Sequence, residues 1–211
     1  YENGQPYGQP LKDVLTLNRY LKREGYAVLG GGKIYHGGGG LPNEAKTDWD
    51  DYFNRGADPH PAVKSVSGLN RAHFDWGPLD VPDSAMGDYK VSTWIGDQLQ
   101  KKYDRPFFMG CGMFRPHLPW YVPRKYFDLF PADKVTLPNV KDDDLDDIPP
   151  IGRKFAKPDG DHKKVIQYGQ WRKAVQGYLA SINFMDTCIG RVLDALDSSP
   201  HAKNTAIVLW S

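Results

Sequence analysis

The sequence has little cysteine, no excess of one charge and no long apolar run, and each shortage excludes a class of protein. Two cysteines in 211 residues are too few for a disulfide framework, and neither lies near a histidine at the spacing of a zinc site. The net charge of +1 predicts no broad electrostatic field for nucleic acid or a membrane surface. No apolar run approaches the roughly 20 residues of a membrane-spanning helix. An anionic ligand must therefore be held by a local cluster of cations and hydrogen-bond donors.

The two cysteines, Cys111 and Cys188, lie in apolar segments. We expect both to be buried free thiols, and a single bridge between them is the alternative. The chain also has 22 glycines and 17 prolines, so much of it should form loops. We expect a long loop in His36–Gly77, and a second segment, Pro119–Ile151, is rich in proline and aspartate. In the second of these, the acidic run Lys141–Asp147 lacks the register of a calcium loop and is expected to be solvated.

Apolar periodicity predicts helices that alternate with short buried strands. The predicted helices are Leu11–Arg23, Lys90–Lys102 and Lys164–Leu196. The predicted strands are Tyr26–Leu29, Pro106–Phe114 and Ala206–Trp210. Gly30–Gly32 are expected to form a glycine-rich loop after the first strand. This order is typical of an α/β fold with a largely parallel central sheet flanked by helices.

The long helix and the two ends of the sequence add two expectations. The helix is expected to bury an apolar stripe that consists of Val175, Tyr178, Leu179, Ile182, Met185, Ile189, Val192 and Leu196. The sequence starts at Tyr1 without a signal-like segment and stops at Ser211, directly after an apolar run. A natural domain rarely ends on a buried strand, so we expect a piece of a longer protein in which the sheet is incomplete at both edges.

Polar side chains follow two of the predicted strands at the point where each strand ends. Lys33 and His36 follow the glycines, and Arg115 and His117 follow the strand that starts at Pro106. In open α/β sheets, ligands bind beyond the carboxyl ends of the strands. If these strands are parallel neighbours, Lys33, His36 and His117 can converge on one pocket. A lysine suits an oxyanion such as sulfate or phosphate, and imidazoles exchange protons near neutral pH.

Four segments, in this order, resemble the type I sulfatases of the alkaline-phosphatase superfamily. They are Leu21–His36 (LKREGYAVLGGGKIYH), Pro106–Pro119 (PFFMGCGMFRPHLP), Tyr178–Leu196 (YLASINFMDTCIGRVLDAL) and Asn204–Ser211 (NTAIVLWS). The resemblance covers essentially Leu11–Ser211. Two further stretches, Trp76–Pro82 and Tyr121–Pro131, favour the iduronate-2-sulfatase branch of the family.

The resemblance implies that residues 1–211 are the middle part of one catalytic domain that hydrolyses a sulfate ester of a sugar or polysaccharide. It implies that Lys33 contacts a sulfate oxygen and that His36 hydrogen-bonds the formylglycine diol and takes its proton when sulfate is expelled. It also implies that His117 protonates the leaving oxygen or binds beside it. Arg115 stands where the family has a basic residue, and we expect it among the substrate-binding residues.

The resemblance also implies groups that this sequence does not supply. The formylglycine of the family arises from Cys or Ser in a C-x-[PA]-S-R or S-x-[PA]-S-R segment, and neither occurs here. The acidic calcium ligands are expected before Tyr1 and after Ser211. We therefore expect calcium and formylglycine in the longer protein, no metal bound by this chain, and no hydrolysis by the chain alone.

The expected partner is a sulfated carbohydrate, with no nucleic acid and no membrane, and the sequence does not indicate an oligomeric state. The family is usually periplasmic, secreted or lysosomal, so we expect export. Two alternatives stay open. One is a phosphodiesterase or phosphonate hydrolase on the same scaffold, although such enzymes usually replace the GGKIYH loop with metal ligands. The other is a pseudoenzyme that binds carbohydrate through Trp49, Trp76, Trp120 and Tyr121.

Overall fold

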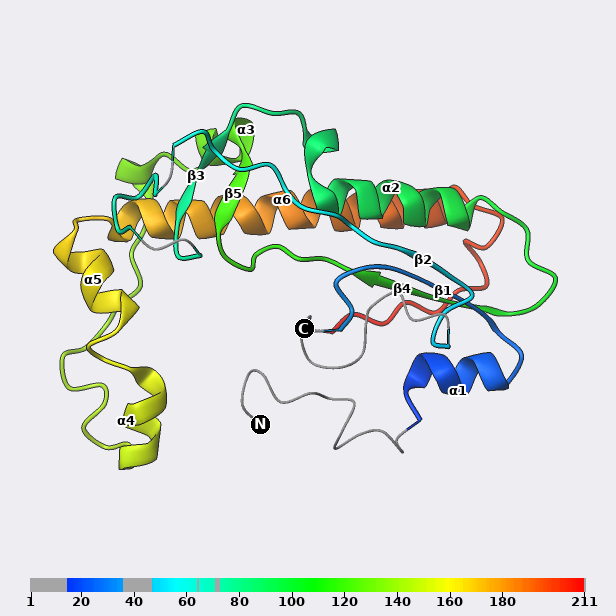
Figure 1. Cartoon of the computed structure of the whole chain (residues 1–211), viewed down its shortest axis with the longest axis horizontal. Coiled ribbons are helices and arrows are strands. Elements are labelled where there is room, and N and C mark those ends of the chain that lie inside the picture. The colour runs from blue at the N-terminus through cyan, green and yellow to red at the C-terminus, as the bar shows by residue number, and fades with distance from the viewer. Residues whose placement is uncertain (1–14, 36–46, 64, 71–72, 211) are drawn as a thin grey trace. The chain divides into compact units, whose positions relative to one another are not determined.

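The computed structural model describes residues 15–35, 47–63, 65–70 and 73–210 (Figure 1). These residues fall into two compact units. Unit 1 contains the described residues up to Asp58, together with Asp83–Phe114 and the described residues from Met185 onward. Unit 2 contains the described residues of Pro59–Pro82 and Arg115–Phe184.

Unit 1 is built on a three-stranded sheet in the order β2-β1-β4 (Figure 1). The strands are β1 (Ala27–Gly32), β2 (Asp51–Phe53) and β4 (Phe107–Gly112). β1 is parallel to both neighbours, and its register with β4 runs from the Ala27–Phe107 pair to the Gly32–Gly112 pair. All six residues of β1 are buried, as expected for a central strand of a parallel sheet. The parallel pairing assumed for the strands before Lys33 and Arg115 is therefore confirmed.

The prediction that Gly30–Gly32 form a loop is wrong, because they complete β1. Glycine is needed there for space rather than for a turn. A Cβ on Gly30 would lie 2.8 Å from the ring of Trp49, which packs against the strand. Gly32 has a φ of +86°, and a Cβ there would overlap the carbonyl oxygen of Gly112.

Three helical segments cover the sheet of unit 1: α1 (Leu17–Arg23), α2 (Gly87–Leu99) and the second half of α6 (Trp171–Asp197). α2 confirms the predicted helix but begins three residues before Lys90 and ends at Leu99. α1 begins at Leu17, so the predicted helix is wrong at residues 15 and 16, and residues 11–14 lie outside the described part. The buried core between helices and sheet consists of Val91, Ile95, Leu99 and Leu196.

The apolar run Ala206–Trp210 does not form the predicted strand. Its residues pair with no described strand, and Leu209 keeps 82% of its surface exposed. The two cysteines also differ from each other. Cys188 is fully buried, as predicted, whereas Cys111 is exposed, and both are free thiols. An apolar pattern by itself does not supply the neighbouring strand that a buried strand requires.

Unit 2 has a two-stranded parallel sheet of β3 (Trp76–Leu79) and β5 (Trp120–Pro123). Its helices are α3 (Arg124–Asp128), α4 (Pro150–Ala156), α5 (Asp161–Gln167) and the first half of α6. The core consists of Leu69, Trp76, Val165 and Ala174. The proline- and aspartate-rich segment Pro119–Ile151 contains β5 and α3. Within it, the acidic run of residues 141–147 is largely exposed, as expected. Every described strand pair is parallel, which confirms the α/β class.

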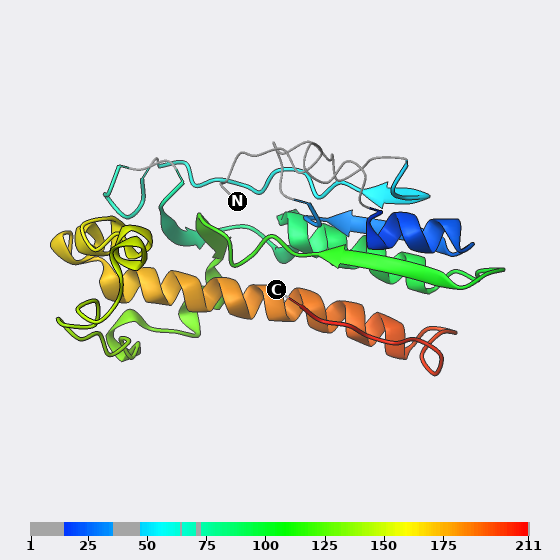
Figure 2. The same ribbon diagram turned by 90° about the horizontal axis from the view of Figure 1, so that it is seen from below.

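The predicted helix over Lys164–Leu196 is divided into α5 and α6. The break contains Gly169 with a φ of +61°, and α6 then continues without interruption to Asp197 (Figure 2). The buried face of α6 is also different from the predicted stripe, and it consists of Ala174, Gly177, Ala180, Ser181, Phe184, Cys188 and Leu196. Small residues dominate because neighbours approach closely. A Cβ on Gly177, for example, would lie 2.8 Å from the Cβ of Trp76.

We predict that Gly32→Ala destabilises the protein by about 3 kcal/mol or more, because it adds a steric overlap to a strained φ. The matched control is Gly25→Ala, since Gly25 has a φ of +85° but no atom within 4 Å of its added Cβ. This control should cost only about 1 kcal/mol. Denaturant unfolding of the two variants measures the difference, and equal losses would contradict the close approach of β1 and β4.

Candidate functional site

Lys33 follows β1 directly and lies beside the end of β4. Its backbone N–H donates to the carbonyl oxygen of Gly112 at 2.8 Å, which extends the hydrogen-bond ladder beyond the strand. Lys33 and the residues after Gly112 therefore share the carboxyl edge of the sheet, where ligands bind in open α/β folds. Lys33 thus comes directly after a buried strand, whereas the sequence analysis placed it after a glycine-rich loop.

The two residues after Lys33 are fixed by separate contacts. Ile34 packs over Gly110, where an added Cβ would lie 2.8 Å from its Cδ1 atom. The Tyr35 hydroxyl donates to Oδ2 of Asp48 at 2.9 Å and contacts Oδ1 of Asn18 at 3.0 Å. The segment after Lys33 therefore contacts β4 through Ile34 and the buried Asp48 carboxylate through Tyr35.

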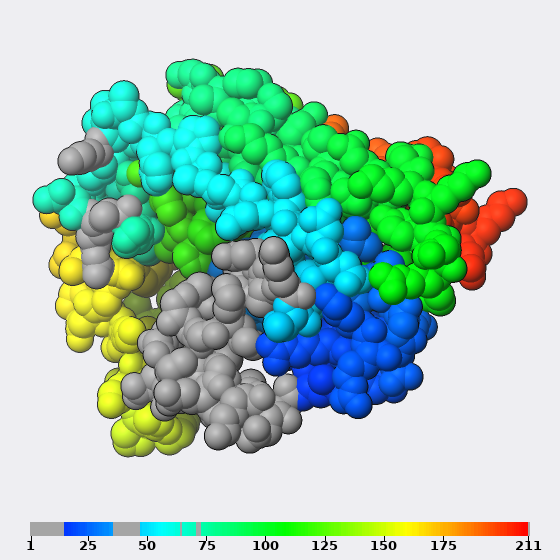
Figure 3. Space-filling model, turned by 45° about the vertical axis from the view of Figure 1, so that its right-hand side comes forward, coloured from blue at the N-terminus to red at the C-terminus, as the bar shows by residue number. Residues whose placement is uncertain are grey.

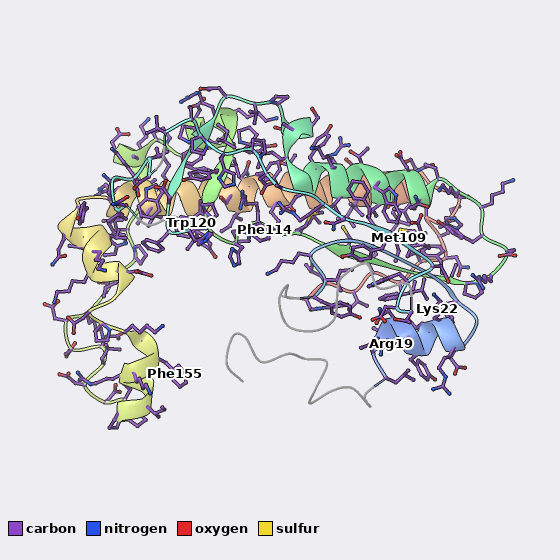
Figure 4. All side chains as sticks on the ribbon, viewed as in Figure 1. Arg19, Lys22, Met109, Phe114, Trp120 and Phe155 are labelled. Atoms are coloured by element: carbon purple, nitrogen blue, oxygen red, sulfur yellow. The ribbon has the colours of Figure 1, made fainter. Side chains whose placement is uncertain are left out.

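Asp48 in turn joins this segment to α1. Arg19 donates to Oδ1 of Asp48 at 2.6 Å, and Lys22 lies 3.0 Å from Oδ1 of Asp50 (Figure 4). Burial by itself raises the pKa of Asp48, but hydrogen bonds from Arg19, Thr47 and Tyr35 outweigh it and hold that pKa below its usual range. Figure 3 shows α1 in blue next to the cyan residues that follow position 47. Arg19 and Lys22 of α1 thus form ion pairs inside unit 1.

Three residues that the sequence analysis missed are linked to the Lys33 side chain through the ring of Phe114. The ring of Phe114 is labelled in Figure 4. Its centroid lies 5.6 Å from the ammonium of Lys33 and 4.4 Å from the guanidinium of Arg55. Oδ1 of Asp88 accepts the Phe114 N–H at 2.9 Å and the Arg55 Nε–H at 3.3 Å. Asp88 is completely buried. An aromatic ring fixed by a buried carboxylate therefore supports the lysine.

The charge of Arg55 is largely offset by acidic neighbours. Its Nη2 atom lies 2.6 Å from Oδ2 of Asp58, in addition to the contact with Asp88. Apolar periodicity in the sequence did not indicate that Arg55 and Asp88 would lie at this site. Asp88 lies in the first turn of α2, ahead of the predicted helix, and Arg55 lies in a segment without regular structure.

The second group of predicted site residues lies in unit 2. Arg115 and His117 precede β5 in a short segment whose Arg115–Pro116 and Leu118–Pro119 peptide bonds are cis. The His117 side chain is exposed, and its Nδ1 atom lies 2.5 Å from the carbonyl oxygen of Leu118. Because a carbonyl oxygen only accepts, this contact favours a proton on Nδ1 and leaves proton exchange to Nε2.

Arg115 is buried, with 3% of its surface exposed. Its Nη1 donates to the carbonyl oxygen of His117 at 3.0 Å, and its Nη2 donates to that of Tyr121 at 3.1 Å. The structure therefore brings Arg115 and His117 together. The predicted contact of Arg115 with substrate stays a prediction.

Asp75 is a buried carboxylate behind this segment that the sequence analysis also missed. It accepts the backbone N–H groups of Val66 and Ser67 at 2.7 Å each, and the hydroxyl of Tyr121. Burial raises the pKa of Asp75, but hydrogen bonds from Ser67, Tyr121 and Val66 outweigh it and lower that pKa from its ordinary value of 3.8. Burial and the Asp75 carboxylate together raise the pKa of Tyr121.

The predicted meeting of Lys33, His36 and His117 stays a prediction. Lys33 belongs to unit 1 and His117 to unit 2, and His36 lies outside the described residues. Within the described ranges, no group of three or more His, Cys, Asp or Glu side chains could hold a metal ion. The described side chains therefore offer no site that fits calcium. None of the helices described here is long and apolar enough to cross a membrane.

We predict that Asp75 stabilises the fold in a pH-dependent way. Because its pKa is lowered on folding, the unfolded carboxyl binds a proton at higher pH than the folded one. The stabilisation should be complete near neutral pH and should be lost as the pH falls below 3.8 through the lowered pKa. Unfolding free energies of wild type and Asp75→Asn, measured from pH about 6 to about 3, should converge on acidification. A constant difference would rule out this role.

The sequence is similar to those of known proteins. The family model described as Sulfatase matches residues 1–211. A protein of Formosa agariphila named Sulfatase is 39% identical over 95% of this chain and 41% of its own length. Human iduronate 2-sulfatase is 29% identical over 93% of this chain and 39% of its own length.

The Choline-sulfatase of Rhizobium meliloti is 21% identical over 100% of this chain and 44% of its own length. The chain thus spans less than half the length of these curated relatives. The match of the family model extends over the whole sequence, and the alignment with the relative at 39% identity includes 95% of this chain. The resemblance to the type I sulfatases is therefore confirmed, and the chain belongs to the sulfatase family.

Proposed function

We propose that this chain is the middle part of the catalytic domain of a sulfuric ester hydrolase and supplies part of its sulfate pocket. The observation that carries the proposal is the position of Lys33. It lies at the carboxyl edge of a parallel sheet in a sulfatase-family chain, and β4, Tyr35 and the Phe114 ring hold it in place.

Lys33 is proposed to bind a sulfate oxygen. An ammonium is a compact point charge, and negative charge on the sulfuryl group and the leaving oxygen grows as the ester bond breaks. A cation that is already oriented stabilises this charge without reorganisation during the reaction. The bond from Lys33 N–H to Gly112 and the anchor at Tyr35 supply that orientation.

His117 is proposed to act on the leaving group. When the sulfur–oxygen ester bond breaks, its electron pair stays on the alcohol oxygen, and a proton from Nε2 of a protonated His117 neutralises it. The contact of Nδ1 with Leu118 O suits this role, because it leaves Nε2 as the atom that delivers the proton. His36 is proposed as a general base, and Arg115 as a residue that binds substrate or supports those that do.

The family's formylglycine and calcium would supply a nucleophile and a Lewis acid from parts of the longer protein outside this chain. For substrate, we propose a sulfated sugar or polysaccharide. The 29% identity to iduronate 2-sulfatase, against 21% to Choline-sulfatase, supports a sugar. We also propose that the protein is exported, as its resemblance to the family implies. The net charge of +1 supports neither nucleic acid nor an anionic membrane as a partner.

We predict that a full-length protein containing this chain cleaves an aryl sulfate, and that Lys33→Ala lowers kcat/KM by about 100-fold or more. Lys203→Ala, which removes an exposed lysine from unit 1, should leave the rate unchanged. The measurement is release of the phenol from an aryl sulfate and from the matching diaryl phosphate, which is a phosphate diester. Preference for the phosphate would select the phosphodiesterase alternative. Wild-type kinetics in Lys33→Ala would contradict the proposed role of this lysine.

We predict that the 211-residue chain alone has no tight calcium site. The family's acidic ligands are expected outside this chain, and the described residues contain no cluster of metal-ligating side chains. Titration calorimetry of the isolated chain with calcium should show no binding at micromolar concentrations. A tight site of one ion per chain would contradict the assignment of the ligands to other parts of the protein.

A further inference from the structure

The backbone around His117 is held by hydrogen bonds from a buried arginine, Arg115. The two terminal nitrogens of Arg115 donate to the carbonyl oxygens of His117 and Tyr121, at 3.0 and 3.1 Å. One planar guanidinium thus links the residue that carries the imidazole to the second residue of β5. The fixed angle between its two N–H groups restricts the position of one carbonyl relative to the other.

Trp120, labelled in Figure 4, provides a second and separate hydrogen bond to this segment. Its indole Nε1 donates to the carbonyl oxygen of Pro116 at 2.7 Å, and its backbone N–H donates to the carbonyl oxygen of Asp75 at 2.9 Å. The residue before His117 is therefore also joined to β5. Asp75 supports this strand from behind through the hydroxyl of Tyr121.

The burial of Arg115 distinguishes it from a cation that binds a substrate. Only 3% of its surface is exposed, and two of its donors are directed to backbone carbonyls of unit 2. His117 by contrast is exposed. A general acid must lie within hydrogen-bond distance of the leaving oxygen, and a displacement of about 1 Å can cost about 100-fold in rate. Rigid support of the backbone at His117 therefore has a direct chemical consequence.

We propose that Arg115 is a positioning residue that acts on the reaction through His117, with Trp120 and Asp75 as its supporting partners. This inference rests on the proposed function, because it assumes that His117 protonates the leaving oxygen. It assigns to Arg115 a role other than contact with the sulfate.

The test uses a full-length protein that contains this chain and two substrates, nitrophenyl sulfate and phenyl sulfate. Nitrophenolate leaves readily without a proton, whereas phenolate depends on the general acid. Loss of positioning should therefore lower kcat for phenyl sulfate by about 100-fold and for nitrophenyl sulfate by about tenfold or less in Arg115→Met. A residue that binds sulfate would lower kcat/KM for both substrates equally.

A double-mutant cycle with His117→Ala gives the second readout. If Arg115 acts only through His117, adding Arg115→Met to His117→Ala should change the rate less than about threefold. The proposal would be overturned in favour of direct sulfate binding if the rate losses of the two single variants multiply in the double variant. It would also be overturned if Arg115→Met lowers the rates for both substrates equally. The matched control is Arg153→Met, which removes an exposed arginine of unit 2 and should leave both rates unchanged.

Trp120→Phe tests the same support without removing a cation. The substitution deletes the indole N–H donor but keeps an aromatic ring in the core. The Trp120→Phe variant should therefore fold even if the Arg115→Met variant fails to fold. A loss that is larger on phenyl sulfate than on nitrophenyl sulfate supports the proposal, and an unchanged ratio overturns it. If the wild type hydrolyses neither sulfate, the proposed function itself fails and this inference fails with it.

Discussion

The pairing of β1 with β4 at Gly32 and Gly112 is the constraint on which the Lys33 side of the site depends. The two backbones approach so closely that a Cβ on Gly32 would overlap the carbonyl oxygen of Gly112, and a Cβ on Gly112 would overlap the backbone of Lys33. That approach lets the Lys33 N–H reach the Gly112 carbonyl and brings the end of β1 beside the segment that contains Phe114. A side chain at either position would move the lysine away from the ring that supports it.

Three buried carboxylates hold the segments on which the candidate residues lie. Asp48 accepts the hydroxyl of Tyr35, Asp88 accepts the N–H of Phe114, and Asp75 accepts the hydroxyl of Tyr121. An unpaired buried carboxylate would be strongly unfavourable, so each is surrounded by donors or cations. Because these bonds are directional, they fix loop positions more narrowly than apolar packing does. The same principle therefore operates separately in unit 1 and unit 2.

The sequence predicted the parts of the structure that follow from local pattern. The strands that precede Lys33 and Arg115, the parallel α/β class and the helix at α2 follow from apolar runs and their order, whereas the pairing of β1 with β4 had to be assumed. Features that depend on distant partners could not be predicted. The glycines of β1 leave space for Trp49 and for the backbone of Gly112. The buried face of α6 depends on neighbours such as Trp76, and Asp75 is buried by residues far away in the sequence. Periodicity records which residues are apolar, but it does not record what packs against them.

The central claim is that Lys33 and His117 act on one sulfate group. A crystal structure of the full-length protein with sulfate bound tests this most directly. The account predicts that Nζ of Lys33 and the imidazole of His117 both lie within hydrogen-bond distance of the same bound sulfate. A sulfate held by only one of them, with the other directed to a different surface, would contradict it.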